Sequence, residues 1–455
     1  MMKVKNLILV FMTIFLTASI SVKSQSWSEL GGTDALAANG EILNICSDSA
    51  GNIYASGYFR NSSDNYYVAK WDGNNWTELG GLDALGANSI IYSMCIDSSG
   101  NIYVGGEFSN SSGKKYVAKW DGNSWSELGG ENALSANSFI TALYSHSDGT
   151  IYAGGAFTND STKRYVAKWD GTSWSELGGF NGLAANKNIY SICGDNAGNI
   201  YAAGEFTNDS SKYYVAKWNG STWSELGGFN GLNANLWMYS ICSDEANNIY
   251  AAGNFQNSSG KRYVAKFDGT SWSELGGTDN LAADGIIFSL CWDKAGKLYA
   301  SGSFENSVQQ QYVAQWDGNG WTELGELNGQ VFAGMIYTVH ADASGNVYTG
   351  GDFKNDVGNR FVAKNSDNAT SVGELEKKLN KYLVYPNPAQ NSVYIKSENG
   401  ISESSYSLVN PSGKSVSSGK INSEKMQLNI QDLPSGSYML NIGDKLKDSY
   451  KLIKK

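Results

Sequence analysis

Five cysteines have the clearest chemical potential in this sequence, because they could form disulfides, bind a metal or act as nucleophiles. Their spacing follows a 49-residue period, and Tyr144 and His340 hold the same position of the period in two further copies. Equivalent positions of a repeat lie on different copies, whereas a disulfide requires Cα atoms within about 7 Å. We therefore predict unpaired, buried thiols that pack as small hydrophobic groups, and no disulfide. A ring of thiolates around a metal is the less favoured alternative. The cysteines are Cys46, Cys95, Cys193, Cys242 and Cys291.

The histidines and acids do not form a recognisable catalytic set. The chain has two histidines, His146 and His340, at different positions of the repeat. Neither a Ser-His-Asp arrangement nor a His-rich metal set can be assembled from them. Aspartates recur before Gly or Asn turns, where Asp caps its own backbone. Because a group needed once for chemistry would not appear in every copy, we expect no catalytic residue, no metal and no cofactor. These aspartates are Asp48, Asp97, Asp195, Asp244, Asp293 and Asp342.

A 49-residue repeat positions all of these side chains. Seven tryptophans mark it without insertion or deletion: Trp27, Trp76, Trp125, Trp174, Trp223, Trp272 and Trp321. One unit, residues 90–128, contains four short runs rich in β-branched and aromatic residues, with Asp-x-x-Gly-Asn and Asp-Gly-Asn turns between them. Four short strands in a period of about 40 to 50 residues are typical of β-propeller blades.

The count of strand runs predicts how the ring closes. The first three runs of the repeat occur seven times, the last copy spanning residues 335–364, and the fourth run also occurs seven times. The first copy of the fourth run, residues 27–30, precedes all others, so the last blade lacks an outer strand that the N-terminus can supply. We therefore predict an all-β fold with a seven-bladed propeller closed by the N-terminal strand, which also removes an exposed edge. An open solenoid would leave that strand unpaired.

The repeat resembles bacterial seven-bladed propeller repeats with an Asp-x-x-Gly-Asn-Ile-Tyr core, found here from Asp97 to Tyr103. It also resembles kelch-like repeats with a Gly-Gly-x-Phe step and a Trp-Asp-Gly-x-x-Trp hairpin. The resemblance covers residues 27–364. It implies the fold and leaves activity open, because propellers host unrelated functions.

The N-terminus predicts export. Lys3 and Lys5 precede an apolar run over residues 7–18, so residues 1–25 are predicted to be a signal peptide for Sec-dependent export. No other segment approaches 18 apolar residues, and we expect no membrane span in the mature chain. Without the signal peptide, 31 basic residues stand against 44 acidic ones, a net charge of −13. This balance argues against a nucleic-acid partner.

The composition changes near the C-terminus, where all four prolines lie. Tyr-Pro-Asn-Pro at 385–388, Asn-Pro-Ser-Gly-Lys at 410–414, Leu-Pro-Ser-Gly-x-Tyr at 433–438 and a basic end follow one another. This segment resembles the type A C-terminal sorting domain of the type IX secretion system of Bacteroidetes. The resemblance implies a small β-sandwich that engages the secretion machinery and is usually cleaved, leaving the cargo secreted or on the outer-membrane surface. A generic β accessory module is the alternative. The predicted organisation is signal peptide 1–25, propeller 26–364, linker 365–381 and sorting domain 382–455.

Function is expected on the long loops. Two connections of each repeat are tight turns and two are long, and connections alternate between the faces of a meander. Both long loops should therefore share one face, where loops carry function on a rigid scaffold. Three positions on this face vary while the frame around them stays nearly constant, which predicts a sugar- or peptide-binding rim. Its predicted residues are Phe180, Phe229, Trp237, Glu107, Glu205, Tyr58 and Asp352.

The favoured function is a non-enzymatic protein that binds a glycan or an extracellular protein. A polysaccharide hydrolase or lyase is the alternative, with Glu107, Glu131 and Glu205 as acid and base. A catalytic pair should give one blade an inserted loop or a unique acid–aromatic cluster, and the uniform 49-residue spacing argues against it. Neutral drift on an idle surface would also produce the variable positions.

Overall fold

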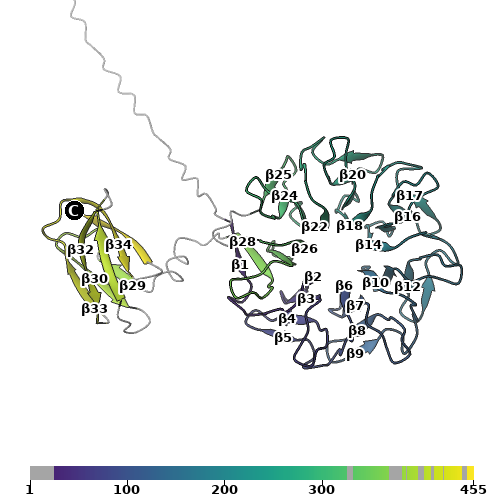
Figure 1. The fold of residues 1–455 in the computed structure, drawn as a ribbon, viewed down its shortest axis with the longest axis horizontal. Coiled ribbons are helices and arrows are strands. Elements are labelled where there is room, and N and C mark those ends of the chain that lie inside the picture. Colours follow the sequence, from purple (N-terminus) through teal and green to yellow (C-terminus); the bar gives the residue numbers. More distant parts are fainter. Residues whose placement is uncertain are drawn as a thin grey trace, which may run out of the picture. The chain divides into compact units, whose positions relative to one another are not determined.

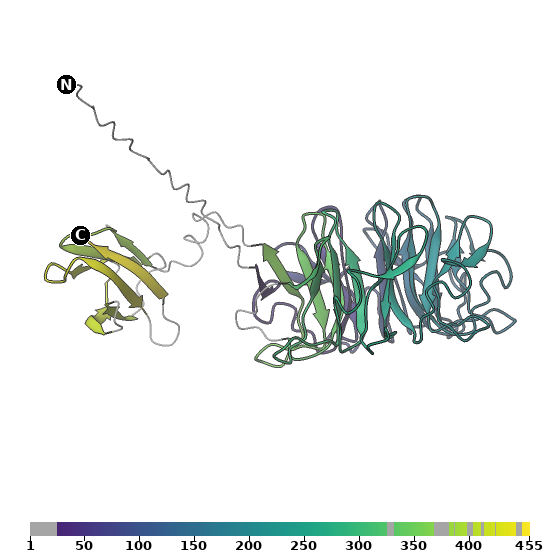
Figure 2. The ribbon, with the colours of Figure 1, turned by 90° about the horizontal axis from the view of Figure 1, so that it is seen from above.

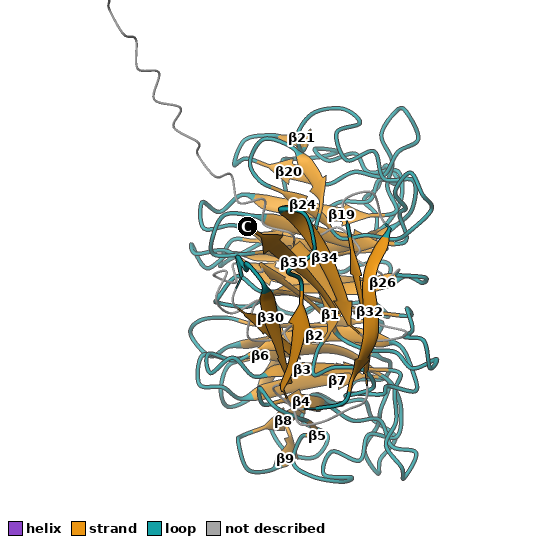
Figure 3. Cartoon of the chain, turned by 90° about the vertical axis from the view of Figure 1, so that its left-hand side faces the viewer, coloured by secondary structure: helices purple, strands orange, loops and turns teal. Residues whose placement is uncertain are grey.

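The computed structural model describes residues 25–324, 332–367, 382–385, 387–397, 404–410, 414–423, 425–442 and 448–455. These residues form strands and loops, and no helix occurs among them (Figure 3). The chain divides into two compact units, Met1–Asn368 and Ala369–Lys455. Of the predicted signal peptide only Gln25 is described, and it already belongs to a strand. The predicted linker is described only as far as Asp367, where the last strand of the first unit ends.

The first unit is built from antiparallel four-stranded sheets that surround a common centre (Figure 1). Within the described residues, six sheets each use four consecutive strands. Three of them contain β2 (Ile42–Ser47), β3 (Ile53–Gly57), β4 (Ala69–Trp71) and β5 (Trp76–Glu78); β6 (Ile91–Ile96), β7 (Ile102–Gly106), β8 (Ala118–Trp120) and β9 (Trp125–Glu127); and β10 (Ile140–Ser145), β11 (Ile151–Gly155), β12 (Ala167–Trp169) and β13 (Trp174–Glu176). The other three contain β14 (Ile189–Gly194), β15 (Ile200–Gly204), β16 (Ala216–Trp218) and β17 (Trp223–Glu225); β18 (Met238–Ser243), β19 (Ile249–Gly253), β20 (Ala265–Phe267) and β21 (Trp272–Glu274); and β22 (Ile287–Trp292), β23 (Leu298–Gly302), β24 (Ala314–Trp316) and β25 (Trp321–Glu323).

A further sheet of the first unit joins both ends of the repeat region. Its order is β1-β28-β27-β26, with β1 (Gln25–Glu29), β26 (Ile336–Ala341), β27 (Val347–Gly351) and β28 (Ala363–Asp367). β1 runs antiparallel to β28, with Trp27 opposite Asn365. The indole Nε1 of Trp27 donates a hydrogen bond to the carbonyl oxygen of Leu324 at 2.8 Å. The N-terminal strand is therefore the outer strand of a sheet made from the last copy of the repeat.

Local hydrogen bonds explain the tight turn between the first two strands of a sheet. The Asp97 Oδ1 accepts the backbone N–H groups of Ser99 and Asn101, both at 2.9 Å. Its Oδ2 accepts the Asn101 amide at 2.6 Å and the Tyr103 hydroxyl at 2.9 Å. The aspartate thus holds the turn and ties it to β7, every residue of which is buried. At the other end of β7, a Cβ on Gly106 would lie 2.0 Å from the Ile90 oxygen, so only glycine fits there.

The first strand of each sheet of the first unit faces the centre (Figure 1), and neighbouring first strands contact each other around the ring, including β26 with β2. Figure 2 shows these sheets from the side, with loops at both ends of the strands. Serine side chains connect some of these neighbours. The Ser93 Oγ in β6 accepts the backbone N–H of Leu143 in β10 at 2.9 Å, and Ser191 does the same for Ile241 at 3.1 Å. Packing of sheet on sheet and these hydrogen bonds together give the centre a fixed geometry.

The second unit contains a three-stranded sheet, β29-β30-β33, and a four-stranded sheet, β32-β31-β34-β35. Val393 and Ile395 of the first sheet share a buried core with Leu408, Leu440 and Leu452 of the second. The strands are β29 (Tyr382–Tyr385), β30 (Ser392–Ser397), β31 (Ser404–Val409), β32 (Ser415–Ile421), β33 (Lys425–Asn429), β34 (Gly436–Ile442) and β35 (Asp448–Lys454). Across the described part of the chain, no helix has the length and apolar character needed to span a bilayer.

Candidate functional site

Both long loops of each repeat emerge on one face of the first unit. In the sheet of β2 to β5, Ile42 at the start of β2 lies opposite Gly57 at the end of β3, whereas Ser47 and Ile53 flank the tight turn at the other end. The β3–β4 loop leaves the sheet beside the start of β2, and the loop from β5 returns to the same end of the next sheet. We call this end the long-loop face and the opposite end the tight-turn face.

A β-bulge in every first strand turns one side chain toward the centre of the long-loop face. The register between β6 and β7 shifts between Ile91 and Ser93, so Tyr92 has no partner in the ladder. The same shift occurs in all seven first strands. A bulge bends its strand and re-aims a side chain, and bulges are common beside functional sites. The bulged residues are Leu43, Tyr92, Thr141, Tyr190, Tyr239, Phe288 and Tyr337.

These seven residues line a central opening together with Glu41 and Tyr58. Its volume is about 340 Å³, within the range of roughly 300 to 1,000 Å³ that small-ligand pockets occupy. We call these nine residues the axial aromatic site. Six of their side chains are aromatic, and each of these six comes from a different sheet.

The aromatic rings form a nearly continuous belt along one side of the axial aromatic site. Tyr190 and Tyr239 stack with centroids 5.4 Å apart and an interplanar angle of 15°. Tyr239 contacts Phe288 at 5.3 Å, and Phe288 contacts Tyr337 at 5.3 Å. On the other side Tyr58 meets Tyr92 at 6.3 Å. Such contacts hold the rings in defined positions, so the belt is an organised surface before any ligand arrives.

Carboxylates surround this belt. The Tyr190 hydroxyl donates to the Glu205 Oε2 at 3.3 Å, and Ser89 donates to the Glu107 Oε2 at 3.3 Å. Burial raises the pKa of the Tyr337 phenol, and the nearby carboxylates of Glu41 and Asp352 raise it further. The opening therefore combines aromatic rings with negative charge.

Arg360 reduces that charge at one point. Its guanidinium donates to the Asp352 Oδ1 through Nε at 2.8 Å and also through Nη2. The positive charge of Arg360 also lowers the pKa of Tyr337, against the larger effect of burial. None of the nine residues that line the axial aromatic site is basic.

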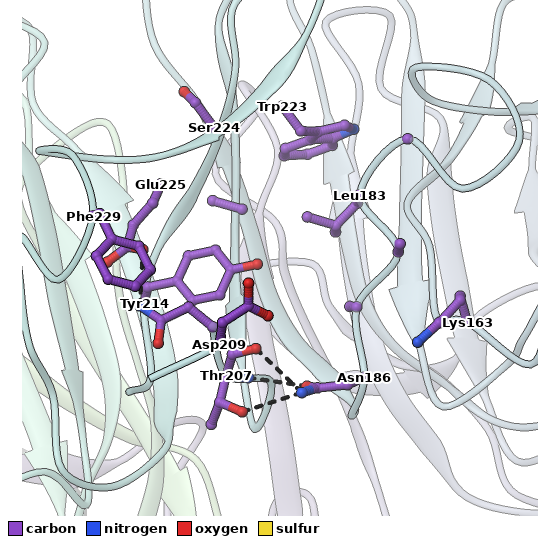
Figure 4. A pocket seen from close by; sticks show the side chains of 15 residues that line it. Lys163, Leu183, Asn186, Thr207, Asp209, Tyr214, Trp223, Ser224, Glu225 and Phe229 are labelled. Atoms are coloured by element: carbon purple, nitrogen blue, oxygen red, sulfur yellow. Dashed lines mark hydrogen bonds between the residues drawn. The ribbon is translucent and has the colours of Figure 1, made fainter. Parts of the chain in front are cut away.

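A second cavity lies farther out on the long-loop face, over the sheet of β14 to β17 (Figure 4). It measures about 420 Å³ and is lined by Phe229, Tyr214, Trp223 and Glu225, among others. We call it the lateral groove. A smaller copy of about 150 Å³, lined by the equivalent Tyr67, Trp76 and Glu78, occurs in the sheet of β2 to β5. A cavity at this repeat position therefore occurs in at least two copies, and the lateral groove is the larger of these two.

Hydrogen bonds fix the polar residues around the lateral groove. The Asn186 amide donates to the Thr207 carbonyl oxygen at 3.2 Å and to its hydroxyl at 3.1 Å (Figure 4). The Asn208 amide donates to the Glu225 Oε2 at 3.0 Å, while the buried Oε1 of the same carboxylate has no partner among the described residues. Phe229 is 65% exposed at the edge of this cavity.

The residues predicted for a ligand-binding rim fall into two regions. Tyr58 belongs to the axial aromatic site, and Glu107, Glu205 and Asp352 hold the equivalent position beside it. Trp237 is half-buried, with its ring 6.5 Å from that of Tyr213. Phe229 lies in the lateral groove, and Phe180, 64% exposed, holds the equivalent position in the preceding loop. The axial aromatic site and the cavity beside Phe229 share no lining residue.

Sequence reasoning missed the bulged aromatic residues. Tyr190, Tyr239, Phe288 and Tyr337 read as ordinary strand residues in the repeat. A signal was present, because one repeat position carries Leu, Tyr, Thr, Tyr, Tyr, Phe and Tyr in the seven copies while its neighbours remain aliphatic or small. That the side chain at this position points toward the centre depends on the bulge, which the sequence does not reveal.

The cysteines lie near the centre of the tight-turn face, around an opening of about 950 Å³. All five are free, but only Cys193 is buried, and the other four are partly exposed, contrary to the expectation of burial for all. Burial raises the pKa of the Cys291 thiol to about 11. His340 shares a hydrogen bond of 2.8 Å with the Ser47 hydroxyl, and burial lowers its pKa to about 4. No group of three or more His, Cys, Asp or Glu side chains in the described ranges could hold a metal ion.

Comparison with known proteins agrees with the fold and identifies the tail. The solved structure of PorZ, an essential surface component of the type IX secretion system of Porphyromonas gingivalis, matches with a TM-score of 0.50 at 13% identity, over 91% of this chain and 59% of its own. A puromycin-hydrolyzing peptidase of Mycobacterium tuberculosis matches with a TM-score of 0.53 at 12% identity, over 82% of this chain and 61% of its own. This chain thus spans less than two thirds of either protein, and at such identity the likeness shows the fold alone. No curated protein matches the sequence.

Repeated four-stranded sheets around a centre, with a PorZ-like fold, define a β-propeller-type repeat protein. Its destination follows from the tail. Residues 383–455 match the family described as the secretion system C-terminal sorting domain, which confirms the resemblance drawn from the sequence. The protein is therefore a cargo of the type IX secretion system, delivered to the cell surface or outer membrane.

Proposed function

We propose that this protein is a non-enzymatic binding protein that captures a glycan or an extracellular protein on its long-loop face. The observation that carries the proposal is the axial aromatic site, a concave opening with six aromatic side chains on a face made of long loops. Concave sites lined by aromatic groups and a few placed polar groups are what ligand recognition uses. Export by the type IX system places such a site outside the cell.

A seven-bladed ring closed by the N-terminal strand is part of this proposal. The pairing of β1 with β28 supports it. So does the hydrogen bond from Trp27 to Leu324, which has the same form as the bond from Trp76 to Leu30 at 3.0 Å elsewhere in the repeat. A closed ring would hold the axial aromatic site rigidly, because each of its six aromatic residues comes from a different sheet.

The proposed mature protein is the propeller alone. Residues 1–25 act as the signal peptide, residues 26–364 form the binding domain, and the linker 365–381 and the sorting domain 382–455 serve export. Two separate compact units support this division.

Within the binding domain, Tyr58, Glu107, Glu205, Asp352 and Trp237 act at or beside the axial aromatic site. Phe180 and Phe229 act as a separate set on the outer part of the same face. The absence of any inserted loop in the 49-residue period supports binding rather than catalysis, because a catalytic site should interrupt the repeat in one copy.

The test is a glycan-array and pull-down screen with the purified protein, repeated with Tyr239→Ala in the axial aromatic site and Phe229→Ala in the lateral groove. We expect one ligand class to bind, and Tyr239→Ala to weaken it by at least tenfold. Binding that neither substitution changes would contradict the proposed face. Release of sugars from a polysaccharide panel would contradict the non-enzymatic function.

A further inference from the structure

We propose that the axial aromatic site recognises an organic cation, an alkylammonium or guanidinium group. This inference deepens the proposed function and rests on it, since it names the chemistry of the group that enters the opening. Three properties of the site carry it: the aromatic rings that line it, its unpaired acids and the absence of a basic lining residue.

The aromatic rings provide the first part of the argument. The face of an aromatic ring is electronegative and attracts a cation placed within about 6 Å of its centroid. Tyr190, Tyr239, Phe288 and Tyr337 come from four consecutive sheets and lie side by side around the opening. Tyr58 and Tyr92 continue the lining in the next two sheets. A group at the centre would meet rings on several sides, which is the arrangement that recognises quaternary ammonium ligands.

The carboxylates provide the second part. Glu41 lines the opening and, within the described residues, forms no ion pair and no side-chain hydrogen bond. Glu107 and Glu205 beside the site also have no cationic partner there, and each accepts only one hydroxyl hydrogen bond. Asp352 is the exception, because Arg360 neutralises it. The site therefore carries negative charge that the protein itself leaves unpaired.

The electrostatic response of the tyrosines agrees with this picture. Burial raises the pKa of Tyr190, and Glu205 raises it further, against a lowering by Asn188. Glu41 and Asp352 act on Tyr337 in the same direction as burial. Because the pKa values of these phenols are raised, the tyrosines stay neutral at neutral pH. The carboxylates alone therefore set the electrostatic potential of the site.

A saccharide fits the site less well. Sugar recognition requires several directed hydrogen bonds, but the lining offers only Glu41, Thr141 and the tyrosine hydroxyls. An opening of about 340 Å³ at the centre of the ring also admits a single head group more readily than a chain of sugars. A cation is attracted by each ring face within reach and by the carboxylates, and it requires no particular orientation.

The experiment uses isothermal titration of the full protein with matched pairs of probes. Choline is compared with its neutral isostere 3,3-dimethylbutan-1-ol, and the amides of acetyl-lysine and acetyl-arginine with those of acetyl-norleucine and acetyl-citrulline. The first pair reports on a small-molecule source of the cation and the others on a peptide source. We expect at least one cation to bind roughly 5- to 30-fold more tightly than its neutral partner, which corresponds to a preference of about 1 to 2 kcal/mol.

Substitutions locate the effect. Glu41→Gln should reduce the affinity for the cation by at least fivefold and leave the neutral probe unchanged. Asp160→Asn removes one charge from an exposed loop of the same face, away from the opening, and should change neither affinity. Tyr239→Leu should also reduce the affinity for the cation. Tryptophan fluorescence melting checks that each variant folds, because every tryptophan lies in the first unit.

The outcomes separate this inference from the proposed function. Equal affinity for charged and neutral probes, or equal effects of Glu41→Gln and Asp160→Asn, would overturn the cation inference. If no cation binds while a glycan or protein from the screen still binds the long-loop face, the inference fails and the proposed function stands. If the screen also finds no ligand, both fail.

Discussion

Replacing Trp27 with alanine tests whether β1 closes the ring. Trp27 is 6% exposed, meets Phe332 edge to face at 5.4 Å and donates its indole hydrogen bond to the buried carbonyl of Leu324. Truncation of a buried tryptophan to alanine costs about 3 to 5 kcal/mol of unfolding free energy. A carbonyl left without its partner adds about 1 kcal/mol. We therefore expect Trp27→Ala to lower the unfolding free energy of the first unit by about 4 to 6 kcal/mol.

Trp125→Ala is the matched control. Trp125 holds the same repeat position and donates to the Leu79 oxygen at 3.1 Å, but it is only half-buried, so its loss should cost less. Denaturant unfolding followed by tryptophan fluorescence measures the first unit selectively, since all 14 tryptophans lie between residues 27 and 321. If β1 were peripheral, Trp27→Ala would cost less unfolding free energy than Trp125→Ala. A loss below about 1 kcal/mol for Trp27→Ala, with a larger loss for the control, would refute closure by the N-terminal strand.

Four other outcomes follow from the same structure. Burial raises the pKa of Asp97, but hydrogen bonds from Asn101, Ser99 and Tyr103 lower it more, so its folded-state pKa lies below the unfolded value. The melting temperature should therefore be nearly constant from about pH 7 to 5 and fall below about pH 4. A melting temperature that stays constant down to about pH 2 would contradict this. Phe229→Ala should change the unfolding free energy by less than about 0.5 kcal/mol, because the ring is mostly exposed, and a larger loss would mean that it packs as core. Deletion of residues 383–455 should keep the protein from the cell surface, as cell fractionation would detect, and normal delivery would show that the tail is dispensable. Although four of the five cysteine residues are partly exposed, desolvation of the thiols raises their pKa, so they should react slowly with a thiol reagent at pH 8 and rapidly after unfolding. Fast reaction of the native protein would show open access.

Much of the repeat could be predicted because its signals are local. The run from Ile102 to Gly106 and the Asp97 turn before it correspond to β7 and its hydrogen-bonded turn. The aspartate caps its own backbone and thus needs no distant partner. The placement of both long loops on one face also follows from strand order alone. Such features depend on residues within one unit, so a single copy of the repeat contains the information.

The axial aromatic site could not be predicted in the same way. In a regular strand Tyr92 would alternate with Ile91 and Ser93 across the two faces of the sheet. The bulge removes Tyr92 from the ladder, and the Ser93 hydroxyl of that strand binds the Leu143 N–H in the next sheet. The direction of the ring therefore depends on contacts between sheets that lie about 50 residues apart in sequence. The sequence shows that the residue type varies at the position of Tyr92 and its repeat equivalents. Only the bulge shows that these side chains face the centre of the ring.

The bulge also explains how a uniform repeat can carry one asymmetric site. Seven equivalent backbone positions face the same small opening, so a substitution at any of them changes the surface that the proposed ligand would meet. Aromatic rings at Tyr190, Tyr239, Phe288 and Tyr337 make one side of the opening continuous, whereas Leu43 and Thr141 leave the other side discontinuous. A loop position such as that of Phe229 changes only the groove of its own sheet. Variation at the bulged position is thus the most direct route from a repeated scaffold to a specific binding site, because it alters the ligand surface without disturbing the strand ladder or the turns.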